Sequence, residues 1–217
     1  MEIDALIFDF DGTLAELNID FGAMYAEVQA LARQMGLTGD WPEGLLLEVI
    51  AQLAGELDHG FERRAHRLLR QREVAAARRG ALFGFTRELL DRARSLGLAT
   101  AIISRNCGQA IRVVFPQVDE ACDLFLPREA VARPKPHPGH VLAALAGLGA
   151  EPGRAAVVGD HPIDVTGARA AGCLAVGVAS GRMSAADLAQ AGADIVLPNA
   201  AGLLGALGLD GEGLGGN

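Results

Sequence analysis

Two aspartates near the start of the chain, Asp9 and Asp11, directly follow the short apolar segment 3–8. Extended backbone projects alternate side chains to the same side, so both carboxylates can face one ligand. Two acids this close repel each other unless a divalent cation neutralises one of them, while the other keeps a proton because its neighbour's charge raises its pKa. Such a division of roles yields a nucleophile and a general acid.

Polar residues also follow other apolar segments that resemble buried strands. Segment 98–103 precedes Ser104, and segment 155–158 precedes Gly159 and Asp160. Strands are predicted at 3–8, 98–103, 124–126, 155–158, 174–178 and 194–197, and helices at 86–96, 108–115, 138–148, 162–171 and 184–191. This alternation predicts an α/β fold with a mostly parallel, Rossmann-like sheet covered on both faces. Ligands bind such a sheet at the carboxyl ends of its strands, where these polar residues lie.

Residues 15–83 have a different pattern, with helical periodicity at 21–35, 43–57 and 61–79 and no convincing strand before about position 79. We therefore predict an all-helical insertion after the first strand, with hinges near Asn18 and in the glycine-containing segment 80–84. The expected division is an α/β core of residues 1–14 and 84–209, a helical cap of residues 15–83, and a flexible glycine-rich tail at 210–217.

Composition excludes several classes of partner. The chain has 217 residues and a formal net charge of −8, so attraction to nucleic acid or to an anionic membrane is not expected. No apolar run is long enough to span a bilayer, and the acidic N-terminus does not resemble a signal peptide. Three widely spaced cysteines predict neither a disulfide framework nor a zinc site. We expect a soluble, cytoplasmic protein and leave its oligomeric state open.

Four short motifs occur in one order along the chain. They are Asp-Phe-Asp-Gly-Thr-Leu at 9–14, Ser104 after an apolar segment, Lys-Pro-His-Pro at 135–138, and Gly-Asp at 159–160 followed by Asp164. Through these four motifs and their order the chain resembles the haloacid dehalogenase (HAD) superfamily of phosphohydrolases, and specifically its phosphoglycolate-phosphatase-like members with a helical cap. The first and third motifs are the most specific. The resemblance covers about residues 3–200 and implies a HAD-like α/β core.

The resemblance implies a role for each motif residue. Asp9 would attack phosphorus and form an aspartyl-phosphate, and Asp11 would protonate the leaving group and then activate water. Ser104 and Lys135 complete the expected catalytic set, and Lys135 would place positive charge against the phosphoryl oxygens. The resemblance further implies five substrate-binding residues: Thr13, Ser104, Arg105, Asn106 and Lys135.

The family pattern also implies a Mg²⁺ cofactor. The expected metal residues are Asp9, Asp11 through its backbone carbonyl, Asp160 and Asp164, the last of which would hold metal-bound water or Lys135. Carboxylates, phosphate oxygens and waters in octahedral geometry suit Mg²⁺.

Lys135 is the single lysine of a chain that has 18 arginines. A lysine is most often a solvated surface residue. Here the chain uses arginine at every other basic position, and its one lysine falls within a motif, where a compact ammonium differs from a planar guanidinium. We therefore expect the chemistry at this position to require an ammonium.

Ordinary structural roles compete with these functional ones. Asp-Gly pairs favour turns, and Asp160 and Asp164 suit the first turn of a helix. Arg63, Arg67 and Arg70 share one helical face, which we expect to be solvated rather than directed at a substrate. We likewise expect turn or surface positions for the histidines at 137, 140 and 161.

We expect a Mg²⁺-dependent phosphatase that hydrolyses a small phosphate monoester of the phosphoglycolate or sugar-phosphate type. A sugar-phosphate mutase resembling β-phosphoglucomutase keeps the same motifs and stays open as an alternative. A non-enzymatic receiver-like module that accepts a phosphoryl group on Asp9 is a second alternative, although a receiver has no use for the insertion at 15–83. The presence of Asp11 argues against a dehalogenase. The sequence departs from the family pattern at 15–17 and at 161–162, which leaves local linker and substrate contacts open.

Overall fold

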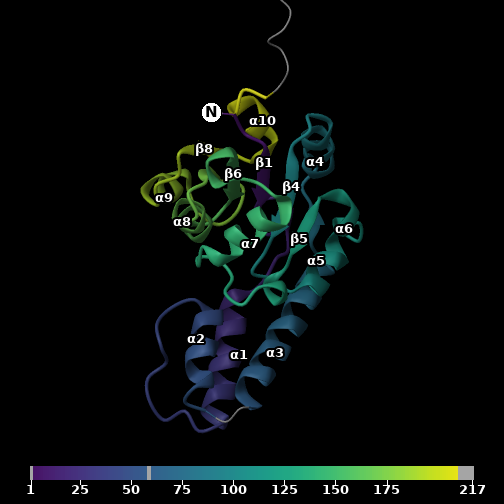
Figure 1. The fold of residues 1–217 in the computed structure, drawn as a ribbon. Coiled ribbons are helices and arrows are strands. Elements are labelled where there is room, and N and C mark those ends of the chain that lie inside the picture. Colours follow the sequence, from purple (N-terminus) through teal and green to yellow (C-terminus); the bar gives the residue numbers. More distant parts are fainter. Residues whose placement is uncertain (1, 58–59, 210–217) are drawn as a thin grey trace, which may run out of the picture.

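A computed structural model describes residues 2–57 and 60–209, and the expected tail at 210–217 lies outside them. Its centre is a six-stranded parallel sheet with the order β5-β4-β1-β6-β7-β8 (Figure 1). The strands are β1 (Ala5–Phe8), β4 (Ala99–Ile103), β5 (Leu124–Leu126), β6 (Ala155–Gly159), β7 (Leu174–Val178) and β8 (Ile195–Leu197). The central strands are buried on both faces, so each forms a continuous apolar run in the sequence.

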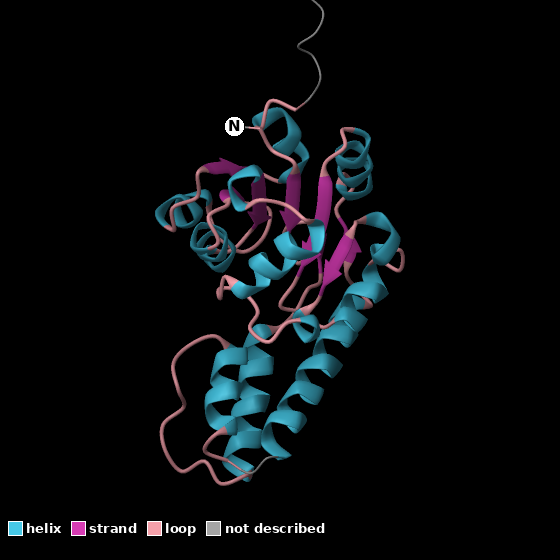
Figure 2. Ribbon diagram, in the orientation of Figure 1, coloured by secondary structure: helices cyan, strands magenta, loops and turns pink. Residues whose placement is uncertain are grey.

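Helices cover both faces of this sheet (Figure 2). Alternate residues of β1 enter two separate hydrophobic clusters, with Leu6 and Phe8 in one and Ala5 and Ile7 in the other. The helices that follow the insertion are α4 (Thr86–Ser95), α5 (Gly108–Val114), α6 (Val118–Ala121), α7 (Gly139–Leu148), α8 (Pro162–Ala170), α9 (Ala185–Gln190) and α10 (Leu203–Ala206). Three short 3-10 turns occur at η1 (Arg128–Ala130), η2 (Pro152–Arg154) and η3 (Ala200–Gly202). The two-sided α/β architecture confirms the predicted fold class.

The residues between β1 and α4 form three helices that lie together beyond one end of the sheet (Figure 1). They are α1 (Phe21–Gln34), α2 (Leu46–Ala54) and α3 (Gly60–Ala77). Apolar residues at helical spacing, including Met24 and Val28, pack them on one another. The segments that enter and leave this unit pair as a short antiparallel ribbon of β2 (Ala15–Glu16) and β3 (Ala81–Leu82). The insertion is therefore not wholly helical, because two-residue strands are too short to produce a detectable period.

The strand order determines which edge of the sheet can bind a ligand. From β1 the chain proceeds to β4 and β5 on one side, and then crosses to β6, β7 and β8 on the other. The carboxyl ends of β1, β4 and β6 therefore adjoin the point where strand order reverses, which is where open α/β sheets bind ligands. Asp9, Ser104 and Asp160 follow these three strands directly.

The hydropathy of the helices and the state of the cysteines were also addressed by the sequence. Within residues 2–57 and 60–209, no helix combines the length and hydropathy that a membrane span requires. All three cysteines are free and buried.

Candidate active site

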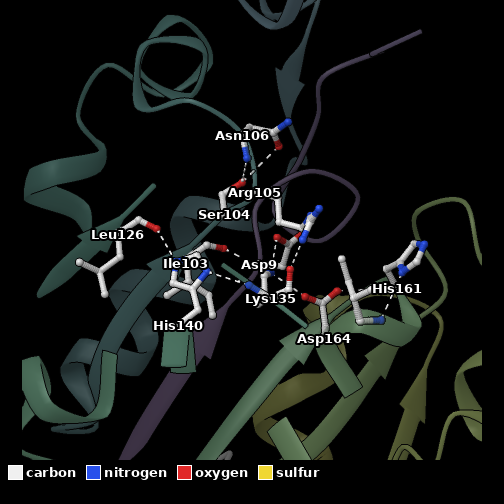
Figure 3. A network of polar contacts seen from close by, with 11 residues as sticks. Asp9, Ile103, Ser104, Arg105, Asn106, Leu126, Lys135, His140, His161 and Asp164 are labelled. Atoms are coloured by element: carbon white, nitrogen blue, oxygen red, sulfur yellow. Dashed lines mark hydrogen bonds and ion pairs between the residues drawn. The ribbon is translucent and has the colours of Figure 1, made fainter. Parts of the chain in front are cut away.

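A buried lysine links two carboxylates at the carboxyl edge of the sheet (Figure 3). Lys135 is inaccessible to solvent, and its Nζ donates to Oδ1 of Asp9 and to Oδ1 of Asp164, at 2.6 Å in each case. The carbonyl oxygen of Ile103, the last residue of β4, lies 3.5 Å from the same nitrogen. One ammonium therefore connects the ends of β1 and β4 with the first turn of α8.

The two carboxylates are themselves held by backbone. The N–H of Asp9 donates to the carbonyl of Val158, which extends the β1–β6 pairing by one residue. Asp164 is the third residue of α8, and its Oδ2 accepts the N–H of His161 at 3.1 Å. Acids in the first turn of a helix also favour its dipole. The capping role considered for Asp164 and its role at the site are thus compatible.

Asp160 completes a cluster of three acids with Asp9 and Asp164. One carboxylate oxygen from each lies within 4.8 Å of the others. A side chain at Gly12 or at Gly181 would clash with the Asp160 carboxylate, and Gly12 also has a φ of +89°. Glycine at these two positions therefore allows two loops to close around Asp160. The N–H of Arg182 donates to Asp160 Oδ2 at 3.3 Å.

Burial and mutual repulsion shift the pKa values of this cluster. Burial raises the pKa of Asp9 to about 7. The positive charge of Lys135 opposes this rise, and the negative charge of Asp164 adds to it. Burial, together with the charges of Asp9 and Asp164, raises the pKa of Asp160 to about 8. Burial alone would lower the pKa of Lys135, but the two carboxylates outweigh it and raise that pKa. The cluster holds more carboxylates than cations, and its all-oxygen donor set fits a hard divalent ion such as Mg²⁺.

Asp11 lies at the same cavity in a different environment. Its Oδ1 accepts the N–H of Leu17 at 2.8 Å, whereas Lys135 donates to Asp9 and Asp164. Burial raises the pKa of Asp11, whereas the hydrogen bond from Leu17 and the charge of Arg182 lower it less strongly. A raised pKa favours the protonated form that a general acid needs.

The remaining predicted substrate residues divide into two groups. Arg105 and Asn106 line the cavity, whereas Thr13 and Ser104 are fully buried and do not. The Ser104 hydroxyl and the Asn106 side chain lie 3.2 Å apart, and the N–H of Asn106 donates to the hydroxyl at 3.1 Å. Among the described residues, the Thr13 hydroxyl has no hydrogen-bond partner. Ser104 therefore supports Asn106 directly in this arrangement.

His140 is a member of the site that sequence reasoning assigned to a turn or the surface. It is fully buried in α7, and its Nδ1 accepts the N–H of Lys135 at 3.3 Å while Nε2 lies 3.0 Å from the carbonyl oxygen of Leu126. Burial and the charge of Lys135 lower the pKa of His140 to about 4. A neutral imidazole therefore fixes the backbone that carries the lysine.

The cavity above the acidic cluster has a volume of about 290 Å³ and is shared between the sheet edge and the helical insertion. Its lining includes a buried ion pair, Glu73 of α3 with Arg128 of η1, which sequence reasoning missed. Glu73 also accepts the N–H of Cys107 at 3.0 Å, and Arg128 donates to the carbonyl of Arg105 at 3.1 Å. The pair therefore ties α3 to the loops after β4 and β5.

Two other arginines connect the insertion to the sheet edge. Both terminal nitrogens of Arg105 donate to Glu48 of α2 at 2.8 Å, and Arg105 also donates to the carbonyl of Lys135. Arg182 lies over the ring of Phe21 in α1, 4.3 Å from its centroid, and donates to the carbonyl of Ile19. Each helix of the insertion thus contacts a charged side chain from the sheet domain: Phe21 of α1 contacts Arg182, Glu48 of α2 contacts Arg105, and Glu73 of α3 contacts Arg128. In contrast, Arg63, Arg67 and Arg70 are exposed, as expected for a solvated face.

Comparison with known proteins gives consistent matches. A family model described as haloacid dehalogenase-like hydrolase matches residues 3–172. Protein CbbY of Rhodobacter capsulatus is 29% identical over 196 residues, which cover 81% of this chain and 85% of that protein. A phosphoglycolate phosphatase of Xanthomonas campestris pv. campestris (strain 8004) is 25% identical over 185 residues, 79% of this chain and 81% of that protein. The solved structure of a HAD family hydrolase from Deinococcus radiodurans R1, with bound phosphate and sodium, has 26% sequence identity and a TM-score of 0.64 and covers 94% of this chain and 95% of its own.

Proposed function

Because the chain belongs to the haloacid dehalogenase-like hydrolase family, we propose that it is a Mg²⁺-dependent phosphatase that hydrolyses a small phosphate monoester through an aspartyl-phosphate on Asp9. The observation that carries this proposal is the position of Lys135 Nζ, 2.6 Å from both Asp9 and Asp164. A buried cation beside a carboxylate at a cavity suits attack on a phosphoryl group whose own oxygens are negative.

In the first step, an oxygen of Asp9 attacks phosphorus while the bond between phosphorus and the leaving oxygen breaks. Lys135 holds Oδ1 of Asp9, so the attack falls to the other oxygen of that carboxylate. Asp11 gives its proton to the departing alkoxide, and Lys135 stabilises negative charge on the phosphoryl oxygens. The products of this step are the alcohol and an acyl-phosphate on Asp9.

In the second step, Asp11 takes a proton from a water molecule that attacks the acyl-phosphate. The bond between Asp9 and phosphorus breaks, which releases inorganic phosphate and restores the carboxylate. Asn106, supported by Ser104, would position a phosphoryl oxygen from the end of β4. We further propose that residues 15–83 act as a cap that would exclude water during the reaction, because all three helices contribute to the lining of the cavity.

Mg²⁺ would be held by Asp9, Asp160 and the backbone carbonyl of Asp11, with Asp164 orienting Lys135. When bound, the ion neutralises charge on the phosphate and on the acidic cluster. The excess of buried carboxylates over cations in that cluster supports this assignment. The name phosphoglycolate phosphatase, carried by a relative, supports a small organic phosphate as the substrate of this chain, with phosphoglycolate and sugar phosphates as the candidates that the family resemblance suggests.

The test is release of phosphate from a chromogenic phosphate ester with Mg²⁺, with a chelator, and with Asp9→Asn. We expect activity only for the wild type with Mg²⁺, while Asp91→Asn on the exposed face of α4 serves as the matched control and retains it. Activity that survives both the chelator and Asp9→Asn would refute the mechanism. A stable acyl-phosphate without turnover would indicate a receiver-like module, and an isomerised sugar phosphate would indicate a mutase.

A further inference from the structure

The cap contributes a largely hydrocarbon wall to the active-site cavity. Met24 of α1, Leu69 of α3, and Leu45, Leu46 and Leu47 at the start of α2 all line it. The acids line the same cavity from the sheet edge. A phosphate held at those acids would therefore direct its organic group toward these apolar side chains.

The polar side chains that the cap adds to this lining already have partners. Among the described residues they are Tyr25 and Glu73. The Tyr25 hydroxyl donates to the carbonyl of Gly44 at 2.7 Å, and the Glu73 carboxylate accepts from Arg128 and from the N–H of Cys107. The hydroxyls of a polyol would lose water on entering this space, and these two cap side chains would offer them only their remaining acceptor positions. Each hydroxyl left without a partner weakens binding by roughly 10-fold.

We infer that the preferred substrate is a phosphate monoester of a predominantly hydrocarbon alcohol, such as a branched alkyl or an aryl phosphate. This inference rests on the proposed function for the chemistry at phosphorus, and it departs from phosphoglycolate and sugar phosphates as preferred substrates. Ile163 in the first turn of α8 and Met183 after β7 add hydrocarbon on the core side. Three arginines line the cavity there too, but each already donates to a protein acceptor: Arg105 to Glu48, Arg128 to Glu73 and Arg182 to the carbonyl of Ile19.

The first test compares two esters of similar size whose leaving groups are both primary alcohols: 3-methylbutyl phosphate and glycerol 3-phosphate. We expect kcat/KM with Mg²⁺ to be at least about 10-fold higher for 3-methylbutyl phosphate. Its branched alkyl group would pack on the apolar wall, whereas glycerol 3-phosphate would place two hydroxyls against that wall. Equal values, or a preference for glycerol 3-phosphate, would overturn the inference.

Failure of the proposed function has a different signature. If neither ester is hydrolysed with Mg²⁺, the proposed phosphatase activity fails. The preference can then be measured as binding of each ester to the Mg²⁺-loaded protein by calorimetry. Tighter binding of 3-methylbutyl phosphate would support the inference, and equal or weaker binding would overturn it.

A second test changes the wall itself. Met24→Gln keeps an unbranched side chain of similar length but adds an amide that can bond to hydroxyls, whereas Met24→Leu keeps the wall apolar. We expect Met24→Gln to reduce the preference for the alkyl ester about 10-fold and Met24→Leu to preserve it. Leu142→Gln on the exposed side of α7 is the control for a polar substitution elsewhere. A folded Met24→Gln protein with an unchanged preference would contradict the inference, and if that variant does not fold, the comparison of esters decides.

Discussion

Lys135→Arg tests whether the site needs an ammonium or only a positive charge. Lys135 has no solvent exposure, and its Nζ meets two carboxylates at 2.6 Å and a carbonyl at 3.5 Å. A tetrahedral ammonium can direct separate protons at acceptors that converge on one nitrogen. A guanidinium is planar and larger, so it suits a single carboxylate approached edge-on.

Two effects of this substitution can be separated by magnitude. Misplacing one charged donor at a developing phosphoryl charge costs roughly 100- to 1000-fold in turnover, or about 3–4 kcal/mol. Overpacking the buried site costs about 1–3 kcal/mol of stability, while the charge itself remains. Removing the charge with Lys135→Met leaves both carboxylates without their cation and costs more, about 3–5 kcal/mol. We therefore expect both variants to lose turnover and Lys135→Met to be the less stable.

The assays are kcat with Mg²⁺ on a chromogenic ester and urea unfolding followed by far-UV circular dichroism. Arg92→Lys, an exposed exchange on α4, controls for the guanidinium-to-ammonium difference and should change neither quantity. If Lys135→Arg keeps kcat within about threefold of the wild type, positive charge alone suffices and the geometric reasoning is wrong.

Three further results are expected. Since the pKa of His140 falls from 6.5 to about 4 on folding, its neutral form stabilises the protein above pH 6.5, and this contribution is lost as the pH falls toward 4. Between pH 8 and pH 5 the loss is about 2 kcal/mol, so His140→Gln should show a flatter pH dependence in urea unfolding, and an unchanged slope would contradict the assignment. Glu48→Gln should raise KM, and it should cost at most about 1 kcal/mol of stability because the pair of Glu48 with Arg105 is partly exposed. The control is Asp119→Asn, which breaks the similarly bidentate pair with Arg112 and should leave KM unchanged. Equal changes of KM in the two variants would argue against a role for the link between Glu48 and Arg105. Mg²⁺ at 100 times its Kd should stabilise the wild type by about 2.7 kcal/mol in thermal unfolding, and an equal gain in Asp160→Asn would remove Asp160 from the metal site.

Local sequence was sufficient to predict the sheet and the residues at its edge. A parallel strand buried on both faces forms an uninterrupted apolar run. The observed bounds of β4 and β6 therefore agree with the predicted ones to within one residue, and β1 ends where predicted but begins two residues later, at Ala5. The residue after each run, Asp9, Ser104 or Asp160, then lies at the carboxyl edge for topological reasons. The ribbon of β2 and β3 could not be predicted this way, because its pairing joins two-residue segments that lie far apart in the chain.

Side-chain partners were harder to predict because they depend on contacts between distant elements. Glu73 and Arg128 are 55 positions apart, and Arg105 and Glu48 are 57 positions apart. One signal was nevertheless present in α3. Glu73 follows Leu69 by four residues on the buried face of that helix, where an acid requires a partner. The sequence marks such a position as unusual, but only the fold supplies Arg128.

The distribution of arginine and lysine follows from the acceptors that the fold supplies. Arg105 donates to both oxygens of one carboxylate, that of Glu48, and to a backbone carbonyl, and the planar guanidinium group suits this bidentate contact. At the site, Asp9 and Asp164 come from different elements and present one oxygen each to a single nitrogen. A guanidinium would have to reach these two oxygens through different nitrogens, whereas an ammonium reaches both from one, so we expect the cation that joins β1 to α8 to be required as an ammonium. The one lysine in a chain with 18 arginines therefore lies where the acceptors converge.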